Sequence, residues 1–319
     1  MNKSARDFED RKRREFLARV GKILDIDRHR AEEAFHIELQ SSLRINRLTE
    51  ISVPEIFARL EQAEVELEPI PWRDDAWHLL SDKKAVSQSA FFEQGYTYLQ
   101  NASSLAPVAI LDPQPGESIL DVCAAPGGKS SDIASRTGNQ CRLWLNDSIQ
   151  PRIDKLREVV AQFHVKAEQI TDYPGQYLTK HLDETFDRIL LDAQCSGEGM
   201  IDLNHPRALR FWSLARIRKF ARLQEKMLSE AFKLLRPGGV LVYSTCTLAP
   251  EENEAPVDRL LRICPTATLE PIGIDLPGGR PGVTGWENRR FDKRLEHAVR
   301  ITPSIFYETF FVCRIRKEE

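Results

Sequence analysis

Two cysteines stand in separate loops, each after an apolar run that is typical of a buried strand. Cys195 follows Ile189-Leu190-Leu191 within the segment 192–197, and Cys246 follows the run 240–243. Ligand sites of open α/β sheets lie at the carboxyl ends of the strands, so we expect the two thiols to meet in one crevice. A thiolate in such a crevice can act as a nucleophile towards a bound substrate.

A third strand candidate, 119–122, leads into a turn that contains Gly127 and Gly128. Without a Cβ the backbone can approach a polar cofactor closely, and the helix that follows adds its positive end. The turn does not match Gly-x-Gly-x-x-Gly, and with Lys129-Ser130 it has only the last part of a phosphate-binding loop. The sequence therefore favours a nucleotide-like cofactor over an ATPase site.

Two acidic residues follow further strand candidates. Asp147 ends the run 142–146, where a carboxylate can accept hydrogen bonds from both hydroxyls of a ribose. The alternative is a cap for the helix that opens near Pro151. Asp172 could meet an adenine amino group, although the segment 171–175 fits a turn equally well. Both alternatives stay open on the residues alone.

Charge is distributed unevenly along the chain. The formal net charge is only -3, but residues 207–236 carry nine Arg or Lys and two Glu, a local charge of +7. Residues 280–300 carry six basic and three acidic side chains. Such basic clusters suit a polyanionic partner, and a set of solvated helix faces is the alternative.

The six cysteines are scattered, without the paired Cys-x-x-Cys spacing of zinc sites, so no metal is expected. The first 19 residues are polar and charged, and no apolar run approaches the length of a membrane span. We therefore expect a cytoplasmic protein that makes no contact with membranes.

The 319 residues allow one large and one small domain, at roughly 100 to 200 residues each. Helical spacing predicts helices over 5–38 and 55–63, with a short strand over 43–46 between them. Beyond residue 105 strands and helices alternate, which argues for a mostly parallel sheet covered on both faces. The strands are expected over 118–123, 142–146, 186–191, 239–244 and 310–315, and the helices over 129–136, 151–163 and 214–235.

Three segments together resemble signature motifs of a known family. They read Cys-Ala-Ala-Pro-Gly-Gly-Lys over 123–129, Asp-Ala-Gln-Cys-Ser-Gly-Glu-Gly over 192–199, and Tyr-Ser-Thr-Cys-Thr-Leu-Ala-Pro-Glu-Glu-Asn-Glu over 243–254. In order and spacing they resemble the Fmu/Sun/NOP family of RNA (cytosine-5) methyltransferases. The resemblance runs from Gln94 to the terminal strand, roughly two thirds of the chain, and the segment 43–48 is similar to the family's RNA-binding segment.

The resemblance implies a Rossmann-like class I methyltransferase domain that depends on S-adenosylmethionine, with a seven-stranded, mostly parallel sheet, over residues 91–319. A smaller N-terminal α/β RNA-binding domain is expected over residues 1–90. The family acts on structured RNA, so ribosomal RNA is the first expected substrate and transfer RNA the second. A monomer is the expected state of an enzyme that engages a large folded RNA.

The resemblance also assigns roles to the two thiols. It makes Cys246 the nucleophile that adds to C6 of cytosine, and Cys195 the residue that assists product release. The residues alone do not rank the two cysteines. By the same resemblance Asp192 and Lys129 meet the edge of the cytosine base.

The cofactor site implied by the resemblance gathers around the glycine turn. The turn holds the methionine part of S-adenosylmethionine, Asp147 the ribose and Asp172 the adenine, and Arg152 lies beside the pocket. The full set of expected cofactor-binding residues is Cys123, Ala124, Ala125, Pro126, Gly127, Gly128, Lys129, Asp147, Arg152, Asp172 and Asp192.

One position departs from the family pattern. Gln194 stands where the motif usually has proline, which frees φ and adds a polar side chain beside Cys195. The departure keeps a rival hypothesis open, a catalytically idle RNA-binding or ribosome-assembly factor that retains the fold. A DNA or small-molecule methyltransferase is the rival among enzymes, and the lack of a large insertion after Cys195 argues against DNA.

Overall fold

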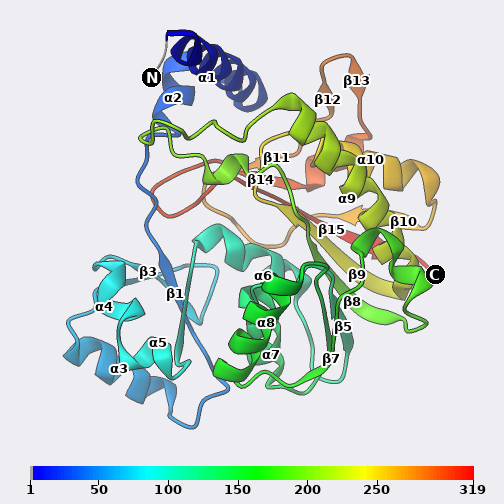
Figure 1. The fold of residues 1–319 in the computed structure, drawn as a ribbon. Coiled ribbons are helices and arrows are strands. Elements are labelled where there is room, and N and C mark those ends of the chain that lie inside the picture. Colours follow the sequence, from blue (N-terminus) through cyan, green and yellow to red (C-terminus); the bar gives the residue numbers. More distant parts are fainter. Residues whose placement is uncertain (1–2) are drawn as a thin grey trace.

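A nine-stranded sheet forms the centre of residues 3–319, which the computed structural model describes (Figure 1). Five neighbouring strands are parallel, in the order β9-β8-β5-β6-β7. They are β5 (Ser118–Asp121), β6 (Arg142–Asn146), β7 (Ala167–Thr171), β8 (Phe186–Asp192) and β9 (Leu235–Thr245). The expected Rossmann-like class I sheet is confirmed.

The other four strands are antiparallel and extend the sheet beyond β9. They are β10 (Ala267–Glu270), β11 (Gly279–Pro281), β14 (Val299–Ile301) and β15 (Phe310–Lys317). The sheet therefore has two strands more than the expected seven. β11 and β14 span three residues each, which is too short for an alternating pattern to stand out.

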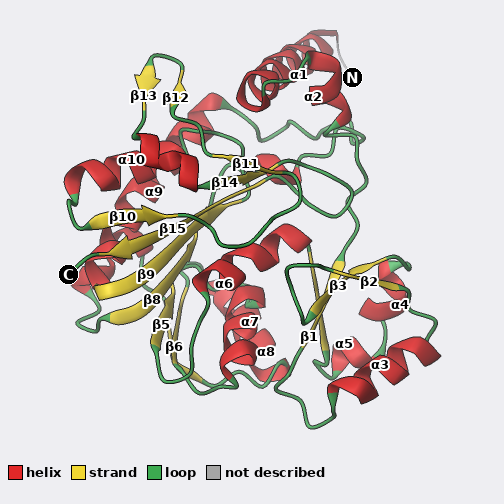
Figure 2. Cartoon of the chain, turned by 180° about the vertical axis from the view of Figure 1, so that it is seen from behind, coloured by secondary structure: helices red, strands yellow, loops and turns green. Residues whose placement is uncertain are grey.

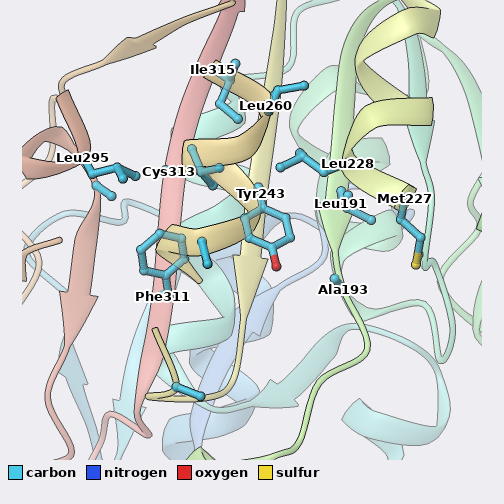
Figure 3. Close-up of a cluster of buried hydrophobic side chains, with 14 of the residues drawn as sticks. Leu191, Ala193, Met227, Leu228, Tyr243, Leu260, Leu295, Phe311, Cys313 and Ile315 are labelled. Carbon is cyan, nitrogen blue, oxygen red and sulfur yellow. The ribbon is translucent and has the colours of Figure 1, made fainter. Parts of the chain in front are cut away.

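Helices cover both faces of this sheet (Figure 1). The helices α6 (Ala106–Leu111), α7 (Gly128–Thr137) and α8 (Gln150–Gln162) pack on one face, and α9 (Leu214–Leu234) and α10 (Glu254–Ile263) on the other. Each face has its own core because side chains alternate along a strand. Figure 3 shows Tyr243, Phe311 and Leu228 in the core under α9 and α10.

A separate four-stranded antiparallel sheet has the order β2-β3-β1-β4. Its strands are β1 (Ser42–Ile45), β2 (Leu67–Pro69), β3 (Ala76–Leu79) and β4 (Thr97–Gln100), and its helices are α3 (Val53–Gln62), α4 (Lys83–Ser87) and α5 (Ala90–Glu93). Leu43 and Ile45 pack against Ile56 and Leu60 of α3, so this sheet has a core of its own. The strand and helix expected in this region are confirmed.

The first two helices, α1 (Lys3–Leu24) and α2 (Arg28–Glu33), lie well apart from the four-stranded sheet (Figure 2). Phe16 of α1 packs edge-on against Phe35 and Trp212, at ring-centroid distances of 4.9 and 5.6 Å, within the core of the larger sheet. The single helix expected over 5–38 is wrong, because Asp25 has a φ of 51° and Asp27 caps a new helix. The division at residues 1–90 and 91–319 stays a prediction.

A buried ion cluster joins the two sheets. The guanidinium of Arg73 lies 2.9 and 3.0 Å from the two carboxylate oxygens of Asp132 in α7, and Arg44 of β1 donates to Ser131. Both arginines are buried. The smaller sheet is therefore fixed against the helix that begins at the glycine turn.

The remaining elements are short. They are the β12–β13 hairpin (Gly285–Trp286 and Arg289–Arg290) and 3-10 helices over Ala102–Leu105, Gly175–Lys180, Glu198–Met200 and Lys293–His297. Among residues 3–319, none of the helices combines the length and the apolar character needed to cross a membrane.

Candidate active site

The two cysteine loops meet at the carboxyl ends of β8 and β9. These strands are parallel, with Asp192 opposite Ser244, so the loops that follow them leave the sheet side by side. The sulfur of Cys195 lies 3.2 Å from the sulfur of Cys246. The structure thus brings together the two thiols that the sequence places in separate loops.

The surroundings of Cys195 disfavour its ionised form. The hydrogen bond with Cys246 raises the pKa of Cys195 well above its ordinary value, and burial raises it further. Cys195 therefore keeps its proton.

An ion pair lies at the same edge of the sheet. Lys129, in the first turn of α7, places its Nζ 2.6 Å from Oδ2 of Asp192, and the Ser244 hydroxyl donates to Oδ1 of Asp192 at 2.7 Å. Burial lowers the pKa of Lys129, but the carboxylates of Asp192 and Asp121 outweigh burial, so the pKa is raised overall. Lys129 is therefore a cation fixed on Asp192, at the strand ends from which the two cysteine loops leave.

Glu252 ties the two cysteine loops together. Its Oε2 accepts hydrogen bonds from the backbone N–H of Ser196 at 2.9 Å and from Nε2 of Gln224 at 3.1 Å. The same Gln224 amide donates to the carbonyl of Gln194 at 2.8 Å. Burial raises the pKa of Glu252 to about 7. Gln224 of α9 and the Glu252 carboxyl group thereby position the Cys195 loop together.

Glu198 makes a second connection between the loops. Its carboxylate accepts from the Trp212 indole at 2.8 Å, from the Thr247 hydroxyl at 2.9 Å and from the backbone N–H of Leu248 at 3.1 Å. The N–H of Gly199 donates to the carbonyl of Cys246 at 2.9 Å. These bonds fix the backbone of both cysteine loops. Trp212, which donates to Glu198, packs in the core and so anchors this carboxylate.

Asp147 lies directly after β6, as expected of a ribose-binding carboxylate. It is buried, its Oδ2 lies 3.2 Å from Arg152, and this oxygen accepts no hydrogen bond from the described residues. Burial raises the pKa of Asp147, although Arg152 opposes the shift. Arg152 also donates to the carbonyl of Ala125 at 2.5 Å. A buried carboxylate oxygen without a donor fits a ribose hydroxyl.

The glycine turn between β5 and α7 is closely packed from behind. Gly127 has a φ of 117°, which favours glycine, and a Cβ on Gly128 would lie 2.8 Å from the Tyr98 hydroxyl. Burial raises the pKa of Cys123, so this thiol stays protonated. Asp172 is exposed after β7 and has no hydrogen bond to the other candidate residues.

Two acidic residues near Lys129, Asp121 and Glu308, are not among the site residues that the sequence predicts. Asp121 ends β5, accepts from Ser130 at 2.8 Å, and has its pKa raised to about 7 by burial. Its position at a strand end was a usable signal. Burial also raises the pKa of Glu308 to about 7, against the nearby Lys129. Glu308 precedes β15 instead of following a strand, and it reaches this edge because β15 runs antiparallel to β9.

Comparisons with known proteins agree with this geometry. The family model of 16S rRNA methyltransferase RsmB/F matches residues 108–316, and that of the N-terminal domain of 16S rRNA methyltransferase RsmF matches residues 13–102. The chain belongs to the RsmB/F methyltransferase family. Members depend on S-adenosylmethionine, and the glycine turn and the Asp147 oxygen that accepts no hydrogen bond from the described residues fit that cofactor.

Relatives in the RsmB/F family differ in length. The chain is 39% identical over 281 residues to the tRNA (cytosine(49)-C(5))-methyltransferase of Pyrococcus abyssi, which covers 88% of each protein. It is 36% identical over 285 residues to the ribosomal RNA small subunit methyltransferase F of Serratia proteamaculans, over 88% of this chain but only 57% of that relative. The chain therefore spans little more than half the length of this bacterial relative.

Solved structures give the same fold. A methyltransferase homolog protein from Pyrococcus horikoshii superposes with a TM-score of 0.78 at 28% identity, over 95% of this chain and 99% of that one. NSun6 from Pyrococcus horikoshii superposes with a TM-score of 0.81 at 21% identity, over 95% and 98% of the two chains. The likeness extends to the four-stranded sheet as well as the methyltransferase sheet, since it covers almost the whole chain.

Proposed function

We propose that this protein transfers a methyl group to C5 of a cytosine in structured RNA, through a covalent bond between Cys246 and C6 of the base. The observation that carries the proposal is the thiol pair, with sulfurs 3.2 Å apart, beside the ion pair of Lys129 and Asp192. A nucleophile and a charged pair for the base edge then face the same space.

The first step uses Cys246 as a thiolate. Cytosine C5 is a weak nucleophile until a thiolate adds to C6, which is covalent catalysis. As the S–C6 bond forms, the electron pair of the C5–C6 double bond shifts towards C5 and N3. Lys129 and Asp192, fixed before the reaction, can stabilise the charge that develops at N3 and the exocyclic amine. S-adenosylmethionine, when bound, supplies the methyl group for C5.

The second step uses Cys195. When Cys246 has become a neutral thioether, its sulfur no longer raises the pKa of Cys195, although burial still does. Cys195 then gives its proton to solvent, and the Cys195 thiolate accepts the proton of C5. The C–H electron pair re-forms the C5–C6 double bond and expels the Cys246 thiolate. The pair returns to its starting state, a Cys195 thiol beside a Cys246 thiolate.

Helix α9 provides a surface for the RNA backbone. The basic side chains Arg216, Arg218, Lys219, Arg222 and Lys226 are exposed, and none of them has a carboxylate partner among the described residues. Cations without ion pairs are available for phosphates, which position an RNA without specifying its sequence. A cytosine must also leave its stack to reach Cys246. We therefore propose a loop or an opened helix of ribosomal or transfer RNA as the substrate, the two classes named for the relatives.

Methyl transfer tests the proposal directly. Ribosomal and transfer RNA are purified separately from cells that lack this gene and incubated with the protein and tritiated S-adenosylmethionine. We expect label in 5-methylcytidine of one RNA class after nucleoside analysis. Binding of RNA and cofactor without label in either class would support the idle assembly factor instead.

Two cysteine variants test the assigned roles. Cys246→Ala is expected to abolish turnover without forming an adduct. Cys195→Ala is expected to accumulate a protein–RNA adduct that survives denaturing electrophoresis, because the second step is blocked. Cys264→Ala, a thiol at the end of α10, is the matched control and should behave as the wild type. Identical behaviour of the Cys246 and Cys195 variants would overturn the roles.

A further inference from the structure

A cavity of about 240 Å³ adjoins the segment that follows the Cys195 loop. Its walls come from residues 34–39 after α2, from residues 199–202 after the Cys195 loop, and from Pro303 and Glu308 before β15. Gly199 donates to the carbonyl of Cys246, and Glu308 lies close enough to Lys129 for the charge of Lys129 to act on its carboxyl group. The cavity and the candidate active site therefore share two walls.

Hydrogen bonds between distant segments hold these walls in place. The N–H of Leu203 donates to the carbonyl of Phe35 at 2.7 Å, and the side chain of Asn204 donates to the carbonyl of His36 at 3.0 Å. The N–H of Gln40 donates to the carbonyl of Ile305 at 2.7 Å. The connector between α2 and β1 is thus fixed on both sides and forms a built wall of the cavity.

The lining combines apolar surface with carboxyl groups. The apolar side chains are Phe35, Leu39, Met200, Ile201 and Pro303, and the carboxyl groups are Glu38, Asp202 and Glu308. No Lys or Arg contributes to the lining within residues 3–319. This cavity therefore disfavours a phosphate, unlike the basic face of α9, and suits a flat group with hydrogen-bond donors at its edge.

Size and exposure narrow the choice of ligand. The volume is below the range of about 300 to 1,000 Å³ that holds drug-sized ligands, which leaves room for one base-sized group. Met200 and Leu39 are 69% and 41% exposed, although large apolar side chains are mostly buried in proteins. Unstacked bases of single-stranded RNA pack on such surfaces and present their edges to polar groups.

We propose that this cavity binds an unpaired nucleobase that neighbours the target cytosine in the RNA, and that Glu308 accepts a hydrogen bond from the exocyclic amino group of that base. The inference rests on the proposed function, because a base bound in this cavity would make methylation of the target cytosine depend on the neighbouring RNA sequence. Adenine, guanine and cytosine carry such an amino group, and uracil does not.

The test uses in vitro transcripts of the RNA that the wild type methylates. Each of the four bases is placed in turn at the two positions on either side of the target cytosine, and kcat/KM is measured. At the position with the strongest preference, a des-amino analogue, inosine for guanosine or purine for adenosine, replaces the preferred base. We expect the analogue, like uracil, to lower kcat/KM about tenfold, the order of one hydrogen bond to a charged group.

Three variants connect that preference to the cavity. Glu308→Met, which removes the acceptor, and Met200→Trp, which fills the cavity, should reduce the ratio between amino and des-amino RNA to about one. Glu308→Gln keeps an acceptor oxygen and should restore part of the ratio. Glu296→Met is the control, since Glu296 is exposed and lies outside the lining.

The outcomes separate this inference from the proposed function. If the wild type methylates RNA but shows no preference at the flanking positions, or if the preference survives in Glu308→Met and Met200→Trp, the cavity does not bind a base as proposed. If the wild type forms no 5-methylcytidine in any RNA, the proposed function itself fails and this inference falls with it.

Discussion

Glu252 is a buried carboxyl group that forms no ion pair with a cation within residues 3–319. Burial raises its pKa from an ordinary value of 4.5 to about 7, so the folded state holds this proton more tightly than the unfolded state does. Its contribution to stability is complete below about pH 4.5 and is lost as the pH rises through 7. The glutamine in Glu252→Gln cannot ionise. The Tm of this variant minus the Tm of the wild type should therefore increase by about 2 °C or more from pH 5 to pH 8.

Glu270 provides the matched control for this titration. Burial raises its pKa, but hydrogen bonds from Arg316 and Arg314 lower it overall, so its stabilising charge is already present at pH 5. Glu270→Gln should lower Tm by a similar amount at pH 5 and pH 8. If thermal unfolding of Glu252→Gln and of the wild type responds equally to pH, Glu252 does not titrate in this range.

Gln194 departs from the family pattern without a visible structural requirement for its own backbone N–H. Its carbonyl accepts from Gln224, but its N–H has no hydrogen bond among the described residues. Proline removes only that N–H and fixes φ. We expect Gln194→Pro to keep the methyl-transfer rate within about threefold, whereas Gln224→Met, which removes both hydrogen bonds, should slow it more. A much larger loss in Gln194→Pro would show that the glutamine itself takes part.

The turn after Cys195 and the end of β9 approach each other closely at Gly199. A Cβ at this position would lie 2.4 Å from the carbonyl oxygen of Thr309 and 3.0 Å from that of Cys246. Gly199→Ala must therefore shift the Cys246 loop or the start of β15. We expect adduct formation in a single turnover to slow about tenfold or more, since small displacements of reacting groups have effects of this order.

Gly273→Ala is the control for the glycine-to-alanine substitution at position 199, because a Cβ on Gly273 would have no neighbouring atom within 4 Å. It should leave the adduct rate and Tm unchanged. If Gly199→Ala forms the adduct at the wild-type rate, the contact between the two loops does not position Cys246.

The sequence predicts those strands whose apolar pattern can be recognised from consecutive residues alone. The parallel strands β5, β6, β8 and β9 are continuous apolar runs because both faces are covered, and they lie within a few residues of their expected positions, apart from the earlier start of β9. β11 and β14 could not be predicted, because each spans only three residues, too few to show an alternating pattern.

The same limit applies to the candidate site. Cys195 and Cys246 follow strands, so the rule for strand ends places them correctly beside each other. Glu308 belongs to this edge only through the antiparallel pairing of β15 with β9. No local pattern carries that information, since the partner strand lies more than 60 residues away.

At the scale of the whole molecule, the contact between the four-stranded sheet and α7 of the larger domain depends on the buried charge of Asp132. Its carboxylate neutralises Arg73 directly and lies 3.8 Å from Arg44, and all three side chains are buried. Removing one partner of a buried ion pair costs about 3 to 5 kcal/mol, because it leaves buried charge uncompensated. Arg73 keeps Asp75 at 2.8 Å, whereas Arg44 loses its ion pair with Asp132. Asp132→Ala should lower the unfolding free energy in urea by that amount.

The position of this cluster predicts where the loss appears first. Arg44 belongs to β1, Arg73 to the turn between β2 and β3, and the aspartate to α7, so hydrogen exchange in Asp132→Ala should accelerate in β1 and β3 before the parallel strands. Tyr98 of the same sheet packs behind Gly128, so S-adenosylmethionine binding should weaken too. Asp154→Ala, which removes an exposed pair with Arg157 and an exposed hydrogen bond from Gln150, should change stability by less than about 1 kcal/mol. Equal effects of the two variants would mean that the sheets are held together by their apolar contacts alone.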